Sequence, residues 1–258
     1  MSELDETKMP LLDHLIELRN RLLWCVFALA IAFGVCLYFA KPIFAFLVQP
    51  LLAAGHGKLI YTDIFEAFFV EIKVAFFAAT MVAFPVIATQ IWRFVAPGLY
   101  AQEKRAFLPF LLMTPVLFTA GAALAYYMAM PVALKFLLGY SGNVGGIQQE
   151  ALPGVGNYLS FATKFLFGFG VAFLLPVLLM LLERVGIVTL AQLKAGRRYA
   201  VVGIAAIAAV LTPPDLMSQI LLLVPMYMLY ELAIIAIMIT GRKRRQPEDA
   251  PAAEQSRI

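Results

Sequence analysis

The sequence predicts an all-α integral membrane protein with six transmembrane helices and both termini in the cytoplasm, with helices five and six short. Of its 258 residues, 62% are hydrophobic and only 14% are charged, whereas soluble domains average about 45–50% apolar and about 25% charged residues. Long apolar runs recur along the chain, and in the resulting topology all of the arginines fall on one side of the membrane. Too little polar sequence remains for a separate soluble domain.

Membrane-length apolar runs define the predicted helices. A transmembrane helix needs about 20 apolar residues, and four runs satisfy this: 22–40, 72–95, 107–130 and 159–182. A fifth region, 199–240, is interrupted by Thr212-Pro213-Pro214-Asp215. Two adjacent prolines remove two backbone donors and disfavour helix before them, so we expect a turn between spans 199–211 and 216–240. The fifth span is then only about 20 Å long, short of a hydrocarbon core of about 30 Å.

The basic residues agree with six spans. If both termini lie on one side of the membrane, all of the arginines lie on that side: Arg19, Arg21, Arg93, Arg105, Arg184, Arg197, Arg198, Arg242, Arg244, Arg245 and Arg257. The other side receives only lysines: Lys41, Lys58, Lys73, Lys135 and Lys164. The positive-inside rule makes the arginine side cytoplasmic. The net charge of +4 therefore indicates contact with anionic lipid headgroups and not with nucleic acid.

Three regions follow from this topology. Residues 1–21 form a cytoplasmic N-terminal amphipathic segment, 22–240 the six-span membrane domain, and 241–258 a cytoplasmic tail that is basic and then disordered. Of the external loops, 41–71 is rich in phenylalanine and is expected to be part helical on the membrane surface. The other, 131–158, contains a glycine-rich stretch and is expected to be a flexible loop. Pro176 and three other prolines inside spans are expected to bend them.

Enzyme motifs give little support for catalysis. The chain lacks the H-E-x-x-H and phosphate-loop patterns, and we expect no metal and no cofactor. Gly139-Tyr140-Ser141-Gly142 matches the motif of rhomboid-like intramembrane proteases, but a serine nucleophile needs a base within hydrogen-bond reach. His14 lies on the opposite side of the membrane and His56 in the other external loop, so a Gly-Ser turn is the better interpretation.

Two acidic residues stand out on the basic, cytoplasmic face. Glu17 lies on the polar stripe of a short amphipathic helix that leads into the first span. Spacing alone favours a local salt bridge from Glu17 to Arg21, four residues later. Glu103 lies in the loop after the second span, and it can pair with Lys104 or Arg105 or be solvated. An exposed carboxylate here could instead accept an arginine from another molecule.

Polar residues also lie on the sixth span. Gln219 and Glu231 are within it, and Asp215 is at its external start, directly after Pro213-Pro214. Intramembrane acids are costly and usually face protein or water. The alternatives are that Glu231 reaches the headgroups and that Asp215 caps the helix.

Four ordered segments resemble the TatC family, the polytopic subunit of the twin-arginine protein translocase. They are His14-Leu15-Ile16-Glu17-Leu18-Arg19 with Arg21, Phe94 to Pro97 with Leu99-Tyr100 and Glu103, Asn157-Tyr158-Leu159-Ser160-Phe161, and Leu211-Thr212-Pro213-Pro214-Asp215 with Ser218-Gln219. The resemblance covers roughly residues 9–241.

The resemblance implies a core subunit and signal-peptide receptor that exports folded proteins across the bacterial cytoplasmic (inner) membrane by using the proton-motive force. Signal peptides with consecutive arginines would bind Glu17 and Glu103, together with Leu18, Arg19 and Phe94. Single-span partners of the TatA and TatB type would dock near Gln219, Glu231, Asp215 and Pro213. The resemblance also implies a homo-oligomer within a receptor complex.

One segment departs from the family pattern. Many members carry an acidic or polar residue in span four, where this chain has Leu174 in Phe173-Leu174-Leu175-Pro176. The role of such a residue cannot be carried over to this chain. The alternative function is a small secondary transporter with an ion or substrate site on span six. It would need polar residues converging from several spans, and spans one to five supply few.

Overall fold

The computed structural model describes residues 3–55, 57–95, 104–139, 142–144, 147–149, 152–184, 186–212 and 216–245. Its elements are α1 (Glu3–Tyr38), α2 (Ala40–Ala53), α3 (Glu66–Val95), α4 (Lys104–Leu124), a π-helical turn η3 (Ala125–Ala129), α5 (Met130–Leu138), β1 (Gly142–Val144), β2 (Ile147–Gln149), α6 (Val155–Ala172), α7 (Leu175–Arg184), α8 (Leu190–Ala195), α9 (Arg197–Leu211) and α10 (Leu216–Arg245). The all-α fold class is confirmed, and the only strands in these described ranges form a small hairpin.

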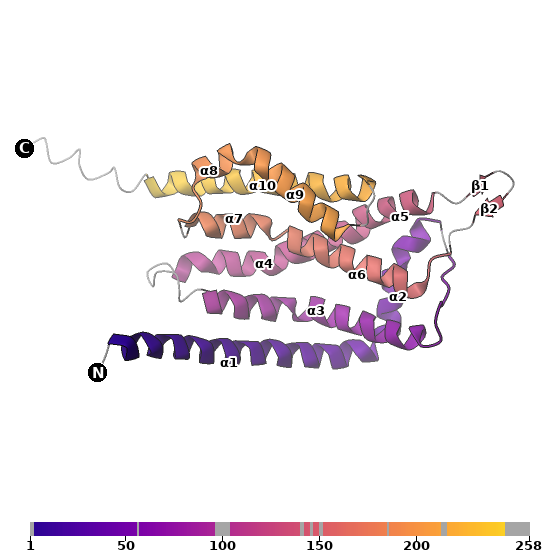
Figure 1. The fold of residues 1–258 in the computed structure, drawn as a ribbon, viewed down its shortest axis with the longest axis horizontal. Coiled ribbons are helices and arrows are strands. Elements are labelled where there is room, and N and C mark those ends of the chain that lie inside the picture. Colours follow the sequence, from indigo (N-terminus) through magenta and orange to yellow (C-terminus); the bar gives the residue numbers. More distant parts are fainter. Residues whose placement is uncertain are drawn as a thin grey trace, which may run out of the picture.

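The long helices lie side by side and alternate in direction (Figure 1). Helix α1 begins and α10 ends at one end of the bundle, which also holds the end of α3 and the start of α9. We call it the arginine end, because Arg19, Arg21, Arg93 and Arg197 lie there. The opposite end carries β1 and β2 and is called the hairpin end. That the arginine end faces the cytoplasm stays a prediction.

Five segments of the described chain are long and apolar enough to cross a membrane: His14–Tyr38, Glu66–Phe94, Leu111–Leu138, Val155–Arg184 and Leu216–Ile239. Helix α9 has 15 residues, about 22 Å, and is short as predicted. The expectation of a short sixth helix is wrong, because α10 has 30 residues and continues through the basic residues up to Arg245. Nothing in that stretch breaks the helix after Thr240.

The first helix differs from the expected two-part arrangement. Helix α1 is continuous from Glu3 to Tyr38 over 36 residues, so the amphipathic segment and the first span are one helix. Pro10 does not interrupt it. The backbone of α1 therefore runs without a break from this segment into the first span.

The third span extends further than its sequence predicts. Pro131 does not end the helix: it lies in the first turn of α5, which follows η3 without a break. A π turn precedes it, in which the Met130 N–H donates to the Ala125 carbonyl five residues earlier. Much of the predicted loop 131–158 is thus the helix α5 and an antiparallel hairpin that pairs Gly142 with Gln149.

The fourth span is divided into two helices just before Pro176, where the sequence predicts a bend. Helix α6 ends at Ala172, and α7 begins at Leu175 after a turn at Phe173 and Leu174. Proline at 176 cannot donate to the Ala172 carbonyl, which weakens the helix at this point. The division changes the direction of the chain where α6 passes α4.

Helix α2 is the helical part of the predicted surface loop, and it runs across the other helices near the hairpin end (Figure 1). Pro50 lies inside α2 and cannot donate to the carbonyl of Phe46. The Tyr126 hydroxyl donates to that carbonyl at 2.7 Å, and the Tyr158 hydroxyl donates to the Leu47 carbonyl at 2.7 Å. Two tyrosines from the bundle therefore hold α2 through its backbone.

Glu66 joins the first external loop to the start of α6. Its carboxylate accepts hydrogen bonds from the Gly156 N–H at 2.5 Å and from the Thr62 hydroxyl at 2.9 Å. The Val155 N–H donates to the Ile60 carbonyl at 2.9 Å. Helix N-termini favour negative charge, so Glu66 stabilises the hairpin end by linking the loop before α3 to the start of α6.

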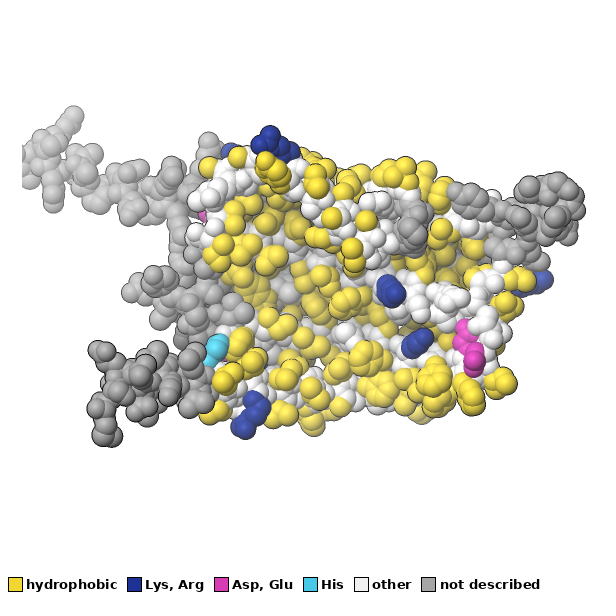
Figure 2. Space-filling view, viewed as in Figure 1, with side chains coloured by type: hydrophobic (Ala, Val, Ile, Leu, Met, Phe, Trp, Pro, Cys, Tyr) yellow, Lys and Arg dark blue, Asp and Glu magenta, His cyan; other side chains and the backbone are white. Residues whose placement is uncertain are grey.

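The core is apolar and lies between the inner helices. Its largest fully buried side chains include Phe118, Phe165, Phe169, Met130, Leu222, Met226 and Ile234. The outer surface is also apolar, since large residues of α1 such as Trp24 and Phe27 are about 60% exposed (61% and 58%). Figure 2 shows hydrophobic side chains covering most of one face, with basic side chains at scattered points. Such a surface fits lipid or partner helices.

Candidate functional site

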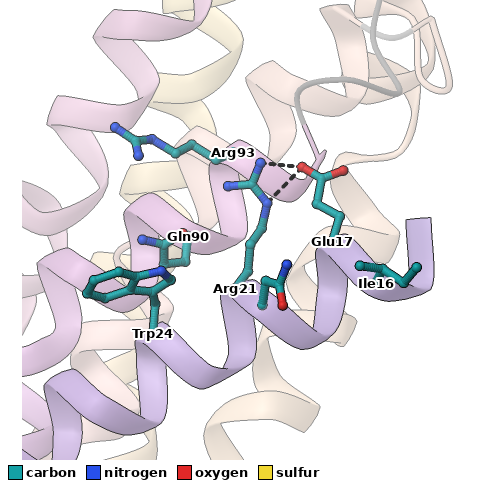
Figure 3. A pocket seen from close by; sticks show the side chains of 7 residues that line it. Ile16, Glu17, Arg21, Trp24, Gln90 and Arg93 are labelled. Carbon is teal, nitrogen blue, oxygen red and sulfur yellow. Dashed lines mark hydrogen bonds and ion pairs between the residues drawn. The ribbon is translucent and has the colours of Figure 1, made fainter. Parts of the chain in front are cut away.

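An open groove at the arginine end lies between α1 and α3. It has a volume of about 680 Å³ and is lined by Ile16, Glu17, Asn20, Arg21, Trp24, Gln90 and Arg93. The five α1 residues recur every three or four positions and so share one helix face. Figure 3 shows Gln90 of α3 beside Trp24, while the guanidinium of Arg93, also on α3, extends away from Arg21 and Glu17. The groove thus combines charged, amide and aromatic groups from two spans.

Glu17 is paired inside this groove. The Arg21 Nε donates to Glu17 Oε1 at 2.9 Å, and a second guanidinium nitrogen donates to the same oxygen. Both side chains remain partly exposed, with relative accessibilities of 33% for Glu17 and 22% for Arg21. Both hydrogen bonds use the same carboxylate oxygen, and the pair can be reached from outside. The salt bridge that spacing favoured is confirmed.

The charge of the groove is not simply acidic. Its ionisable lining residues are Glu17, Arg21 and Arg93, which leaves one excess positive charge. An incoming cation would therefore meet Glu17 already neutralised by its neighbour. Binding of a guanidinium here requires exchange with Arg21 or a further acid from outside the described groove.

Three further predicted signal-binding residues, Leu18, Arg19 and Phe94, are not part of the groove lining. Phe94 stacks on His14, with ring centroids 4.3 Å apart and an interplanar angle of 18°. Leu18 is 42% exposed, and Arg19 is exposed with its guanidinium 3.5 Å from the Asn20 side-chain oxygen. Phe94 thus fixes α3 against α1, which sets the width of the groove.

Three predicted site residues lie outside the described residues. They are Glu103, in the connection between α3 and α4, and Pro213 and Asp215, between α9 and α10. Their predicted roles stay predictions.

Gln219 and Glu231 both bind the neighbouring helix α9. The Gln219 side-chain nitrogen donates to the Ala205 carbonyl at 3.2 Å. Glu231 forms a two-point ion pair with Arg197, with distances of 2.8 Å from Nε to Oε1 and 2.8 Å to Oε2. The Tyr227 hydroxyl also donates to Glu231 at 3.1 Å. These contacts tie the start and the middle of α9 to α10.

Leu174 lines an apolar cavity. A volume of about 320 Å³ lies between α3, α4 and α7, and its lining includes Phe84, Ile91, Leu174 and Leu178. The Trp92 indole N–H donates to the Thr114 hydroxyl at 2.9 Å in the same wall. A carboxylate at position 174 would therefore face hydrocarbon here, and leucine suits the cavity better.

Sequence reasoning missed Trp24, Gln90 and Arg93 as groove residues. Trp24 continues the helical spacing of Glu17 and Arg21, and Gln90 and Arg93 lie three residues apart near the end of a span on the same membrane side. Helical spacing could therefore have predicted that Trp24 shares a face with Glu17 and Arg21, and that Gln90 shares one with Arg93. The pairing of the two sets depends on how α1 packs on α3. In the described part of the chain, no group of three His, Cys, Asp or Glu residues could hold a metal ion.

Comparison with known proteins identifies one family. The family model described as Sec-independent protein translocase protein (TatC) matches residues 13–225. A relative in Magnetococcus marinus, the Sec-independent protein translocase protein TatC, is 45% identical over 251 residues, covering 96% of this chain and 91% of the relative. The protein of the same name in Aquifex aeolicus is 40% identical, covering 94% of this chain and 100% of the relative.

A solved structure has the same fold. The crystal structure of a twin arginine translocase receptor, TatC, superposes on this chain with a TM-score of 0.75 at 39% sequence identity. The match covers 88% of this chain and 99% of the other.

Proposed function

The chain belongs to the TatC family of Sec-independent protein translocase proteins, and from that premise we propose that it is the receptor for signal peptides carrying consecutive arginines. It is a transport subunit of the bacterial inner membrane and not an enzyme. The alternative of a small secondary transporter is not favoured, since the family match covers most of the chain. We further propose that export of folded proteins is driven by the proton-motive force.

The observation that carries this proposal is the position of Glu17. Its carboxylate lies in an open groove at the arginine end, and one of its oxygens accepts both hydrogen bonds from Arg21. A guanidinium presents a planar fork of donors that a carboxylate accepts at two points, which a lysine ammonium cannot reproduce. Glu17 can therefore exchange one guanidinium for another without leaving its charge unpaired.

Glu103 would supply the second acid. The described groove carries one excess positive charge, so two signal arginines need a further carboxylate nearby. Glu103 follows α3, whose last turns form one wall of the groove. We propose that Glu17 and Glu103 each accept one arginine, with Leu18, Arg19 and Phe94 shaping the surroundings.

The arginine contacts contribute more to the specificity for the signal peptide than to the affinity for it. Exposed ion pairs contribute only about 0–1 kcal/mol each. Most of the binding free energy must come from burial of the apolar stretch of the signal peptide, at about 25 cal/mol per Å². The exposed apolar side chains of α1 and the cavity beside Leu174 supply such surface.

Recovery of synthetic signal peptides by the purified protein tests the receptor function. Wild-type protein should recover an Arg-Arg peptide several-fold better than a Lys-Lys peptide. Glu17→Gln and Glu103→Gln should each lower Arg-Arg recovery by up to about fivefold, the equivalent of one exposed ion pair. The same substitution at Glu183, an acid on α7 at the arginine end, controls for loss of charge. Unchanged Arg-Arg recovery in both groove variants would refute the assignment of this site.

We propose α9 and α10 as the surface that docks single-span partners of the TatA and TatB type. Helix α9 is shorter than the bilayer core and exposes Val202 (68%) and Val210 (84%). Gln219 and Glu231 would support this surface by fixing α9 against α10. Pro213 and Asp215, which join these two helices in the chain, would belong to the same surface. Self-association within a receptor complex is part of the same proposal.

A further inference from the structure

A second polar feature lies between α3 and α6, in the half of the bundle toward the hairpin end. A cavity of about 490 Å³ is lined by Lys73 of α3 and Lys164 of α6, together with phenylalanines and two threonines. Both lysines are exposed. In Figure 2, basic side chains lie over this region of an otherwise hydrophobic face. Neither lysine belongs to the groove at the arginine end.

Both lysines lie within membrane-length helices and not at their ends. Lys73 is seven residues after Glu66, where α3 starts, and Lys164 is nine residues after Val155, where α6 starts. At 1.5 Å per residue these are depths of about 10 and 13 Å from the hairpin end. Cations at such depth are costly unless they reach an anion or water. Two of them at one cavity favour a ligand that carries negative charge.

The described side chains do not supply that charge. The carboxylate of Glu66 accepts hydrogen bonds from Thr62, Asp63 and Gly156. Glu71 is two residues before Lys73, a spacing that places side chains on different faces of a helix. Within the part of the chain whose side chains the structure describes, the ion pairs are those of Glu17 and Glu231, and neither involves these lysines.

The walls of the cavity are suited to hydrocarbon. Phe76, Phe77 and Phe167 line it. The hydroxyls of Thr80 and Thr163 donate to backbone carbonyls of their own helices, to Phe76 at 2.8 Å and to Leu159 at 2.7 Å. The ammonium groups are thus the donors that remain for a ligand. A complementary ligand has an anionic head and an apolar chain.

We propose that this cavity binds an anionic phospholipid from the leaflet at the hairpin end. The lipid phosphate lies between Lys73 and Lys164, and an acyl chain lies along the phenylalanine wall. A phosphate has several acceptor oxygens and can bind donors from two helices at once, and lysine side chains extend toward headgroups while their stems cover apolar surface. The lipid joins α3 to α6 and neutralises both cations.

Lipid retention by the purified protein tests this proposal. The probes are phosphatidylglycerol, which is anionic, and phosphatidylethanolamine, which is zwitterionic, offered in equal amounts and measured by native mass spectrometry. Wild-type protein should retain phosphatidylglycerol preferentially. Lys73→Gln and Lys164→Gln should each lower this preference about fivefold, and the double variant about 30-fold, since each basic residue near anionic lipid has a comparable effect.

Two controls make the result specific. Lys58→Gln removes an exposed lysine of the first external loop, outside the cavity, and should leave the preference unchanged. Lys73→Arg with Lys164→Arg keeps both charges and should retain it. An unchanged preference in the double Gln variant would overturn the proposal. The proposal would also be overturned if the double Gln variant kept its lipid preference but no longer co-purified with an acidic single-span partner. That result would assign the two lysines to a protein contact.

Discussion

Among the described residues, the carboxylates of Glu17 and Glu231 are paired with arginines, and the two pairs differ in sequence separation. Glu17 binds Arg21 four residues away on the same helix, so the contact follows from helix geometry alone. Glu231 binds Arg197 from another helix at two points and depends on how α9 packs. The first pair can dissociate without moving a helix. Glu17 is therefore the carboxylate better suited to exchange partners.

Removal of the competing arginine should strengthen signal binding slightly. In Arg21→Gln, Glu17 loses a partner whose i, i+4 pairing contributes about 0.3–0.5 kcal/mol. The affinity for an Arg-Arg signal peptide should rise about twofold, as measured by fluorescence polarisation of a labelled peptide. Arg198→Gln removes an arginine outside the groove and should change the affinity less. A weaker affinity in Arg21→Gln would mean that Arg21 itself contacts the peptide.

At the scale of elements, helices α2 and α9 are each shorter than the hydrocarbon core is thick, and polar contacts to neighbouring helices position both. Tyr126 and Tyr158 hold the backbone of α2. Gln219 and Glu231 hold α9 through Ala205 and Arg197. Hydrogen bonds in lipid set the register between helices because apolar contacts alone do so weakly.

Gln219→Leu tests whether the position of α9 matters for partner docking. The substitution removes the hydrogen bond to the Ala205 carbonyl, an interaction that averages about 0.6 kcal/mol between membrane helices. Co-purification of single-span partners should fall about threefold, and amide hydrogen exchange in α9 should become faster. Gln49→Leu makes the same change in α2 as a control. Unchanged recovery of the partners together with faster exchange would separate α9 from docking.

At the scale of the whole molecule, close contact between α4 and α6 centres the bundle. A Cβ added at Gly121 would lie 2.6 Å from the Phe169 carbonyl oxygen, and one at Gly170 would lie 2.6 Å from the Phe118 ring. Small residues let membrane helices approach until their backbones touch. The large buried phenylalanines fill the space beside these glycines. The outer helix α1 and the short helix α9 then pack around this centre.

Gly121→Ala should destabilise the bundle despite its better helix propensity. Overpacking against a backbone atom costs about 1–3 kcal/mol, whereas replacing glycine in a helix recovers at most about 1 kcal/mol. The midpoint of thermal unfolding in detergent should fall. Gly203→Ala in α9, where an added Cβ meets nothing within 4 Å, should keep or raise the midpoint. Equal stability of the two variants would contradict the close crossing of α4 and α6.

The sequence predicted the parts of this protein that depend on local physics. Apolar runs placed the long helices, Pro176 placed the break between α6 and α7, and the segment Thr212 to Asp215 placed the end of α9 and the start of α10. It did not predict that the chain stays helical through Pro131, because the π turn at residues 125–129 that accommodates this proline follows from packing.

The contacts of the candidate site also include some that follow from local helix geometry and others that depend on packing. Spacing alone predicted the contact of Glu17 with Arg21, since helix geometry brings residues four apart together. Only the tertiary structure brought Gln90 and Arg93 to the same groove and Arg197 to Glu231, because the rotation and register of two packed helices depend on side chains all along their interface. The sequence by itself determined the helices and the family, whereas packing decided which polar groups meet.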